Sequence, residues 1–274
     1  NIFKIPELAK KLFFTLGVII VYRIGVFIPA IGINVALLSE FMNRADTAGG
    51  LLSYLDIFSG GALAQCTLFA LGIGPYISAS IMMQILSLTI PYLEMLSKEG
   101  EYGHKIINQY TRYLALGLSV VYSALYATYL ENAGLVVTPG LAFKLTFIIS
   151  LSVGALFVMW LGEQISMMGL GNGSSVIIFA GIVSHFPDHV IRTMYAVQIG
   201  NLSSIMACVI VIIFVAISAC IIFLEKGDRK IPVQYARRVI GQRIYGGQSS
   251  YIPFKINTVG VMPVIFASSF LNIP

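Results

Sequence analysis

Long apolar runs separated by polar connections make up most of the chain. The runs cover residues 12–29, 64–91, 113–130, 145–161, 174–183 and 203–224, and a further one begins near 258. A helix needs about 20 apolar residues to cross a bilayer, so the pattern predicts six or seven membrane-spanning helices. The fifth run is short enough to be re-entrant, but we expect a span that continues past His185 toward Arg192.

Two places interrupt this pattern. Gly72 and Gly74 precede Pro75 inside the second run, and since proline lacks a backbone donor and glycine weakens helices, we expect a kink or break there. Arg23 lies inside the first run. Its side chain either contacts a pore or turns toward other helices and bonds a carbonyl or snorkels.

A short apolar segment, residues 51–63, precedes the second run. It is too short to span a bilayer and contains Gly60 and Gly61. We therefore expect a short helix hinged on these glycines, either at the interface or folded back into the bundle.

Composition and charge agree with a membrane protein. Of the 274 residues, 57% are hydrophobic and 11% are charged, and the net charge is +5, whereas soluble domains carry about 25% charged residues. With the N-terminus placed in the cytoplasm, 13 of the 17 Lys and Arg residues lie on the cytoplasmic side, as the positive-inside rule requires. Many of them lie between 225 and 257, a connection long enough to suggest a docking site as well as a topology signal.

Two alternative functions make specific demands on the residues of the spans. Coupled small-molecule transporters usually place an ionisable residue near the membrane midplane, and the second, third, fourth and sixth runs hold no Asp, Glu or His. An intramembrane hydrolase would need a pairing such as Ser174 or Ser175 with His185 or His189; a serine after glycine at a helix start is more often a cap. Cys66, Cys208 and Cys220 have no ligand-like spacing, and no metal or cofactor is expected.

A set of ordered motifs identifies the chain more closely. They are Phe58-Ser-Gly-Gly-Ala-Leu63, Phe69-Ala-Leu-Gly-Ile-Gly-Pro-Tyr-Ile-Ser-Ala-Ser80, Lys98-Glu-Gly-Glu-Tyr-Gly103, Gln109-Tyr-Thr-Arg-Tyr113, Met159-Trp-Leu-Gly-Glu-Gln164, Gly171-Asn-Gly173, Asn257-Thr-Val-Gly-Val-Met-Pro263 and Phe266-Ala-Ser-Ser269. In this order, essentially from end to end, the chain resembles the bacterial and plastid SecY family, channel subunits of the Sec protein translocase.

The resemblance implies an all-α polytopic bundle of about ten spans in two inverted halves, a repeat logic shared with transporters. Residues 1–193 would form the first half, with five spans, and residues 194–274 the sixth span, the basic loop and the start of the seventh. Because the chain starts without Met and stops inside an apolar run, we expect it to be truncated. The family's lateral gate would lie between spans two and three and spans seven and eight.

The resemblance also implies roles for particular residues. The apolar pore ring would contain Ile73, Ile77, Ser174, Ile178 and Ile265, where Ser174 departs from the usual apolar residue. The plug, about 51–63, would contain Leu52, Leu55, Ile57, Phe58, Gly60 and Gly61. The surface that docks the motor or the ribosome would contain Lys230, Arg237, Arg238 and Arg243, with Gln242 where a second basic residue is often found.

The implied function is a non-enzymatic channel. It would pass unfolded polypeptides across the membrane and release hydrophobic segments sideways into it. Expected partners are SecE, SecG, the SecA motor ATPase or the ribosome (with a contact to ribosomal RNA), signal sequences, nascent chains and lipids. The expected location is the bacterial plasma membrane, with the thylakoid as alternative, and a small-molecule transporter is the alternative function.

Overall fold

The computed structural model describes residues 6–33, 60–63, 65–233, 238–240, 243–245 and 250–255. The chain divides after His189 into two compact units, and each is treated by itself below. The first carries most of the helices, and the second carries the end of one helix, a further helix and paired strands.

Seven helices account for most of the described residues. They are α1 (Pro6–Val26), α4 (Gly74–Thr89), α5 (Pro91–Lys98), α6 (Glu101–Asn132), α7 (Leu141–Met168), α8 (Gly173–Gln198) and α9 (Ser204–Glu225). Each of the first six apolar runs overlaps a helix, although the helix in the second run begins only at Gly74. α8 continues through Pro187 to Gln198, which confirms that the fifth run extends past His185. The seventh run lies outside the described residues.

The second run does not form one continuous helix. Turns occupy most of the stretch from Gly60 to Ile73, and α4 begins at Gly74 with Pro75 in its first turn, where the missing backbone donor costs nothing. The predicted break is therefore a helix start. A second break was not predicted: α5 turns away from α4 by 102° at Ile90, because the residue before a proline is driven out of the helical conformation.

The polar connection expected between the second and third runs, residues 94–112, is helical rather than a loop. α5 runs to Lys98, and α6 starts at Glu101. Leu93 and Leu96 of α5 are buried with Met83 of α4 in a small apolar cluster. That burial fixes α5 in place, so its charges occupy the outer side of a packed helix.

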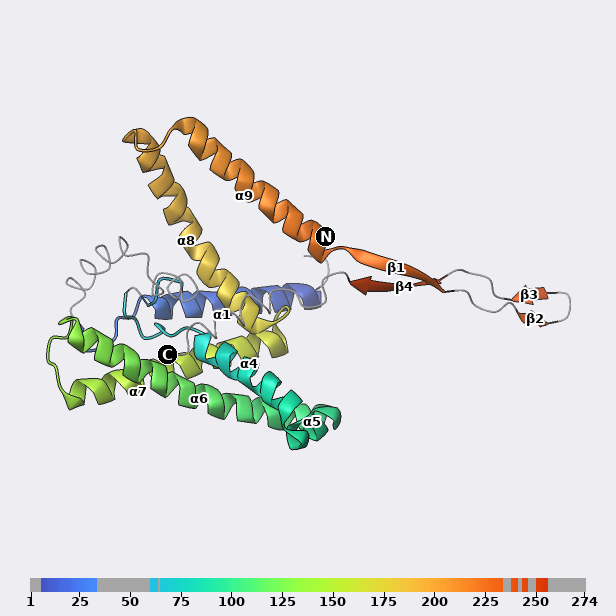
Figure 1. Cartoon of the computed structure of the whole chain (residues 1–274), viewed down its shortest axis with the longest axis horizontal. Coiled ribbons are helices and arrows are strands. Elements are labelled where there is room, and N and C mark those ends of the chain that lie inside the picture. The colour runs from blue at the N-terminus through green and yellow to red at the C-terminus, as the bar shows by residue number, and fades with distance from the viewer. Residues whose placement is uncertain are drawn as a thin grey trace. The chain divides into compact units, whose positions relative to one another are not determined.

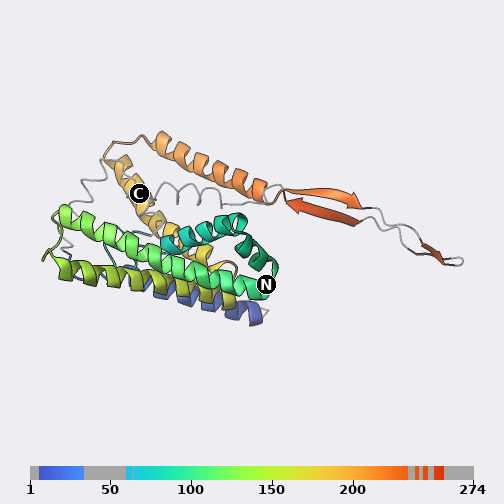
Figure 2. The same ribbon diagram turned by 60° about the horizontal axis from the view of Figure 1, so that its bottom comes forward.

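The first unit is built by antiparallel packing. α6 packs against both α4 and α7, and α1 packs against α7; α6 and α7 lie side by side in Figures 1 and 2. Small side chains allow close approach, as is usual between membrane helices. Ser123 of α6 and Ser152 of α7 are both buried, and their hydroxyl oxygens lie 3.2 Å apart.

Four helices in the described part of the chain are long and apolar enough to span a membrane: α6, α7, α8 and α9. The bent pair α4–α5 adds a fifth as a broken span. α1 is not among them, because Lys10, Lys11 and Arg23 interrupt it. The described residues therefore hold four or five of the six or seven spans expected, and the chain is a multi-pass helical membrane protein.

The second unit contains strands that the sequence analysis did not predict. β1 (Asp228–Val233) pairs antiparallel with β4 (Ser250–Lys255), and β2 (Arg238–Ile240) pairs with β3 (Arg243–Tyr245). The basic connection after α9 is thus a two-part β-ribbon (Figure 1). Every helical residue of α9 lies outside the protein core, which suits a helix whose surroundings are lipid or other spans.

Candidate functional site

Three of the five predicted pore-ring residues lie in one apolar cluster. Ile73 precedes α4 directly and is only 4% exposed, and Ile77 and Ile178 pack against the same cluster as partly buried side chains. The amide of Ile77 donates to the carbonyl of Ile73 over 3.1 Å, so the two residues are one helical turn apart on the same face. We call Ile73, Ile77 and Ile178 the constriction cluster. Ile265 lies outside the described residues.

Ser174 belongs to the cap of α8. The Asn172 side-chain oxygen accepts hydrogen bonds from the Ser174 amide at 3.1 Å, from the Ser174 hydroxyl at 2.6 Å and from the Ser175 amide at 3.4 Å. Asn172 thereby satisfies amides that would otherwise lack a partner at the helix start. Ser174 also lies one turn before Ile178, on the same face of α8, and its place in a pore ring stays a prediction.

The serines and histidines of the hydrolase hypothesis do not meet. Ser174 and His185 are both on α8, 11 residues apart, which at about 1.5 Å of rise per residue separates them by roughly 16 Å along the axis. A serine nucleophile needs its base within hydrogen-bond reach. Within α8 this pairing is absent, and the Ser174 hydroxyl is already bonded to Asn172.

The glycine-rich segment before α4 is held by its neighbours. The amide of Ala30 donates to the Cys66 carbonyl, and the amide of Leu68 donates to the Ile28 carbonyl, both over 2.9 Å. From α6, the Tyr126 hydroxyl donates to the Leu63 carbonyl over 2.9 Å. These bonds tie the segment to the chain after α1 and to α6. They fix the point at which α4 starts and hence the position of the constriction cluster.

The structure describes the last four residues of the predicted plug, Gly60 to Leu63. The first two of them are glycines. Their φ angles are +69° and +83°, a conformation that favours glycine. Arg23 of α1 donates from Nη1 to the Gly60 carbonyl over 3.3 Å. Of the two alternatives for Arg23, this bond agrees with the carbonyl-bonded side chain. The plug residues Leu52, Leu55, Ile57 and Phe58 lie outside the described residues.

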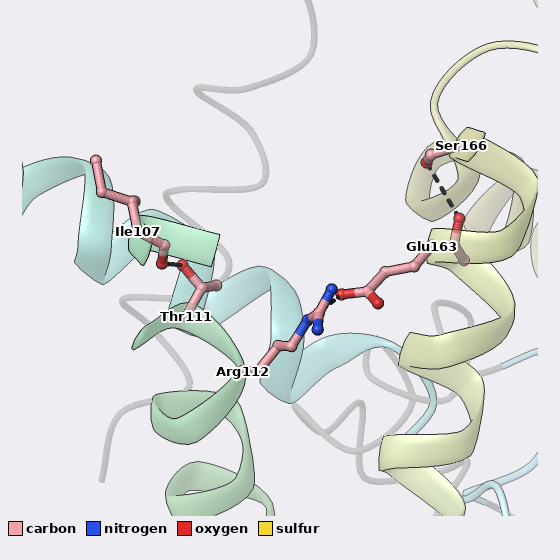
Figure 3. A network of polar contacts seen from close by, with 6 residues as sticks. Ile107, Thr111, Arg112, Glu163 and Ser166 are labelled. Carbon is pink, nitrogen blue, oxygen red and sulfur yellow. Dashed lines mark hydrogen bonds and ion pairs between the residues drawn. The ribbon is translucent and has the colours of Figure 1, made fainter. Parts of the chain in front are cut away.

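An ion pair joins α6 to α7 and was missed by the sequence analysis. Arg112 donates from Nε to Oε1 of Glu163 over 2.7 Å (Figure 3). Both residues lie within quoted motifs but at the polar margins of apolar runs, where a charge is usually only a topology signal. One signal in the sequence could have indicated this ion pair. Arg112 and Glu163 carry opposite charges and lie on two consecutive helices, which a short connection makes antiparallel neighbours.

Three of the four predicted docking residues lie on the paired strands after α9. Lys230 is an exposed residue of β1, and its ammonium lies 4.7 Å from the centre of the Tyr251 ring on β4. Arg238 starts β2 and Arg243 starts β3, and the two strands pair with each other. Arg237 lies outside the described residues. The two strand pairs thus place Lys230 on one sheet, β1–β4, and Arg238 and Arg243 on another, β2–β3.

Comparisons with known proteins agree with this geometry. The SecY family model matches residues 67–274. The protein translocase subunit SecY of Escherichia coli (strain K12) is 44% identical over 272 residues, covering 98% of this chain and 61% of that protein. SecY of Aquifex aeolicus (strain VF5) is 41% identical over 280 residues, covering 100% and 65%. The chain therefore spans roughly three-fifths of the length of these relatives.

Solved structures support the same fold. A protein conducting channel superposes with a TM-score of 0.65 at 20% identity, covering 96% of this chain and 56% of that one. Sec61 in the canine ribosome–channel complex from the endoplasmic reticulum gives 0.63 at 20% identity, with 96% and 56% covered. The helical polytopic fold expected from the sequence is confirmed, and the chain belongs to the SecY family.

Proposed function

We propose that this chain is part of the channel-forming subunit of a Sec translocase, which passes unfolded polypeptides across a membrane and releases hydrophobic segments into it. The constriction cluster is the observation that carries the proposal. Its three members are isoleucines: Ile73 is 4% exposed, and Ile77 and Ile178 pack as partly buried side chains against the same apolar cluster. A cargo of variable sequence cannot be held by specific hydrogen bonds, whereas an apolar constriction excludes ions by dewetting and still lets side chains slide through.

The other predicted elements fit around this constriction. Residues 51–63 are the plug that covers the idle pore, and its final residues are held between α1 and the segment before α4. Ile265 and Ser174 complete the ring. The pore is passive, with no catalytic residue, metal or cofactor. A small-molecule transporter would need a polar or charged group to bind its solute, and the three isoleucines of the constriction cluster supply none.

Partners and location complete the proposal. SecE and SecG contact the spans within the membrane, and lipids surround the rest. SecA or the ribosome, including ribosomal RNA, docks on the β-ribbon through Lys230, Arg237, Arg238 and Arg243, since arginine and lysine suit acidic and phosphate surfaces. Sec61 of the canine complex is bound to a ribosome, which supports this choice. The membrane is the bacterial plasma membrane, with the thylakoid as alternative, and the N-terminus is cytoplasmic.

A reconstitution tests the proposal. The full-length subunit, assembled with SecE and SecG in proteoliposomes, is given SecA, ATP and a preprotein, and protease-protected preprotein is measured. We expect protection that requires ATP and the preprotein's signal sequence. A preprotein without its signal sequence is the control. Saturable uptake of a small solute with no protected preprotein would favour the transporter instead.

A further inference from the structure

Tyr126 of α6 holds the segment that leads into α4 at two points. Its hydroxyl donates to the Leu63 carbonyl over 2.9 Å, and the Cys66 thiol contacts the same hydroxyl oxygen. A phenol carries one proton, and that proton is directed at Leu63, so the thiol is the donor in the second bond. The Cys66 amide also donates to the Leu63 carbonyl, over 3.0 Å. One tyrosine therefore fixes both ends of the turn from Leu63 to Cys66.

The backbone of Cys66 needs such support. Its φ angle is +46°, in the left-handed region where the Cβ atom of an ordinary residue is crowded. Such a conformation persists only where the surrounding structure over-determines it. At Cys66 the side chain is 1% exposed, and its thiol is bonded to Tyr126. Tyr126 thus stabilises a backbone conformation that the residue would not adopt by its own preference.

The segment is shared between two apolar clusters. One set of its side chains is buried in the cluster against which Tyr126 packs, and the other set is buried in the cluster of the constriction. The first set is Leu63, Cys66 and Ala70, and the second is Ala62, Phe69 and Ile73. Rotation of the segment would withdraw side chains from both clusters and expose apolar area. The orientation that Tyr126 fixes on one side therefore decides which side chains enter the constriction on the other.

Consecutive turns connect the fixed point to Ile73. In each turn the amide of the later residue donates to the carbonyl of the earlier one. These bonds join Ala70 to Thr67 over 3.0 Å, Gly72 to Phe69 over 2.8 Å and Gly74 to Leu71 over 3.3 Å. A hydrogen-bonded chain of turns has little slack, so a displacement at Cys66 is passed on to Ile73.

We propose that Tyr126 is a positioning residue of the constriction cluster. By holding Leu63 and Cys66 from the side of α6, it keeps Ile73 buried in the constriction, on the same face as Ile77. The role is static, because Tyr126 sets where the constriction forms and need not move during translocation. This inference rests on the proposed function, since it assumes that the constriction cluster excludes ions from an idle pore.

The first test deletes one hydroxyl in the reconstituted complex, and a second tyrosine of α6 supplies the matched control. Tyr126→Phe keeps the ring and removes both hydrogen bonds. Tyr122 lies one turn earlier, and its buried hydroxyl has no hydrogen-bond partner, so Tyr122→Phe deletes the same group without breaking a bond. We expect Tyr126→Phe to raise ion leak through the idle channel about fivefold, the shift in population that follows the loss of one neutral hydrogen bond.

Tyr122→Phe should leak like the wild type. Wild-type leak from Tyr126→Phe, or equal leak from the two Phe variants, would overturn the positioning role.

A second comparison separates positioning from general stability. Arg112→Gln breaks the ion pair between α6 and α7 and should lower the thermal stability of the complex by an amount similar to that of Tyr126→Phe. We expect no increase in leak from Arg112→Gln, because this ion pair does not hold the segment before α4. If both variants lose similar stability and leak equally, Tyr126 only stabilises the bundle, and the proposal is wrong.

Variants of Cys66 test the other end of the contact. Cys66→Ser keeps a donor for Tyr126, whereas Cys66→Ala keeps the left-handed backbone and loses the donor. We expect near wild-type leak from Cys66→Ser and raised leak from Cys66→Ala. Combined with Tyr126→Phe, Cys66→Ala should raise leak by less than the product of the two single effects, because the two residues share one bond. A full product would show that they act independently and would contradict the proposal.

Failure of the positioning role and failure of the proposed function give different results. If the channel hypothesis holds and the positioning role does not, Tyr126→Phe translocates preprotein and leaks like the wild type. If the channel hypothesis fails, the wild-type complex itself protects no preprotein. Both measurements are made on the same proteoliposomes.

Discussion

The guanidinium of Arg112 on α6 donates to the carboxylate of Glu163 on α7, with 2.7 Å between Nε and Oε1 (Figure 3). The Arg112 side chain is 49% exposed and the Glu163 side chain 20%, so water screens the pair only in part. Near the same helix ends, the Ser166 hydroxyl donates to Gly162 and accepts from the amide of Gly173. The ion pair therefore fixes α6 against α7 beside the turn that leads into α8.

This arrangement predicts that loss of the ion pair loosens the bundle. Arg112→Gln and Glu163→Gln should each cost about 0.5–1 kcal/mol of stability, the scale of a partly exposed pair. The charge-reversed double variant, Arg112→Glu with Glu163→Arg, should recover part of this loss, because opposite charges again face each other. Thermal unfolding of the purified complex measures the effect. Additive losses in a double-mutant cycle of the two Gln variants would show that the pair contributes nothing.

A second prediction concerns the constriction cluster. Ile73→Gly and Ile77→Gly remove apolar side chains on one face of the start of α4, so water should enter the constriction and ion leak through the idle channel should rise. Leu88→Gly is the matched control, since Leu88 is on the same helix but 82% exposed. Conductance across a planar bilayer is the measurement. If the control leaks as much as the two cluster variants, general destabilisation of α4 explains the effect.

Sequence reasoning located the helices well because bilayer-length apolar runs are a strong local signal. The spacing of four residues between Ile73 and Ile77 is likewise a local signal that places both on one helical face. It predicted a disruption at Gly72–Pro75 but not its form, because whether proline kinks a helix or starts one depends on the packing of the preceding segment.

Tertiary features were beyond the reach of local patterns. Pro91 is a local signal for a break at Ile90, but the direction of the 102° bend also depends on the packing of Leu93 and Leu96 with Met83. The pairing of β1 with β4 joins residues about twenty positions apart, such as Ile231 and Ile252, through a connection whose charges indicated only a polar loop. The His185 ring also lies close to Gly61, where an added Cβ would be 2.6 Å from Cε1. No local pattern around either residue predicts this proximity.

A third prediction concerns the start of α8. Asn172→Ala removes the acceptor for the Ser174 and Ser175 amides and should lower stability by about 1 kcal/mol, the usual cost of losing an N-cap. Asn172→Asp keeps the acceptor oxygen and places a negative charge at the positive end of the helix, so it should retain stability. Thermal unfolding of the complex compares the two variants. Equal destabilisation by Ala and Asp would mean that the cap is not what Asn172 contributes.

The last prediction distinguishes residues that bind a cytoplasmic partner from residues that limit ion leak through the idle channel. Arg238→Glu combined with Arg243→Glu reverses two charges at the paired strands β2 and β3, and like charges facing an acidic or phosphate surface are strongly unfavourable. Affinity for SecA or for ribosomes should fall by more than about tenfold, since 1.4 kcal/mol already corresponds to tenfold, and preprotein translocation should fall with it. Ion leak through the idle channel should not change, because the constriction cluster belongs to the other unit. Arg192→Glu makes the same kind of charge reversal once, at an exposed position of α8 outside the strands; it is the control and should bind partners normally. Wild-type affinity in the double variant would place the docking surface elsewhere on the cytoplasmic side.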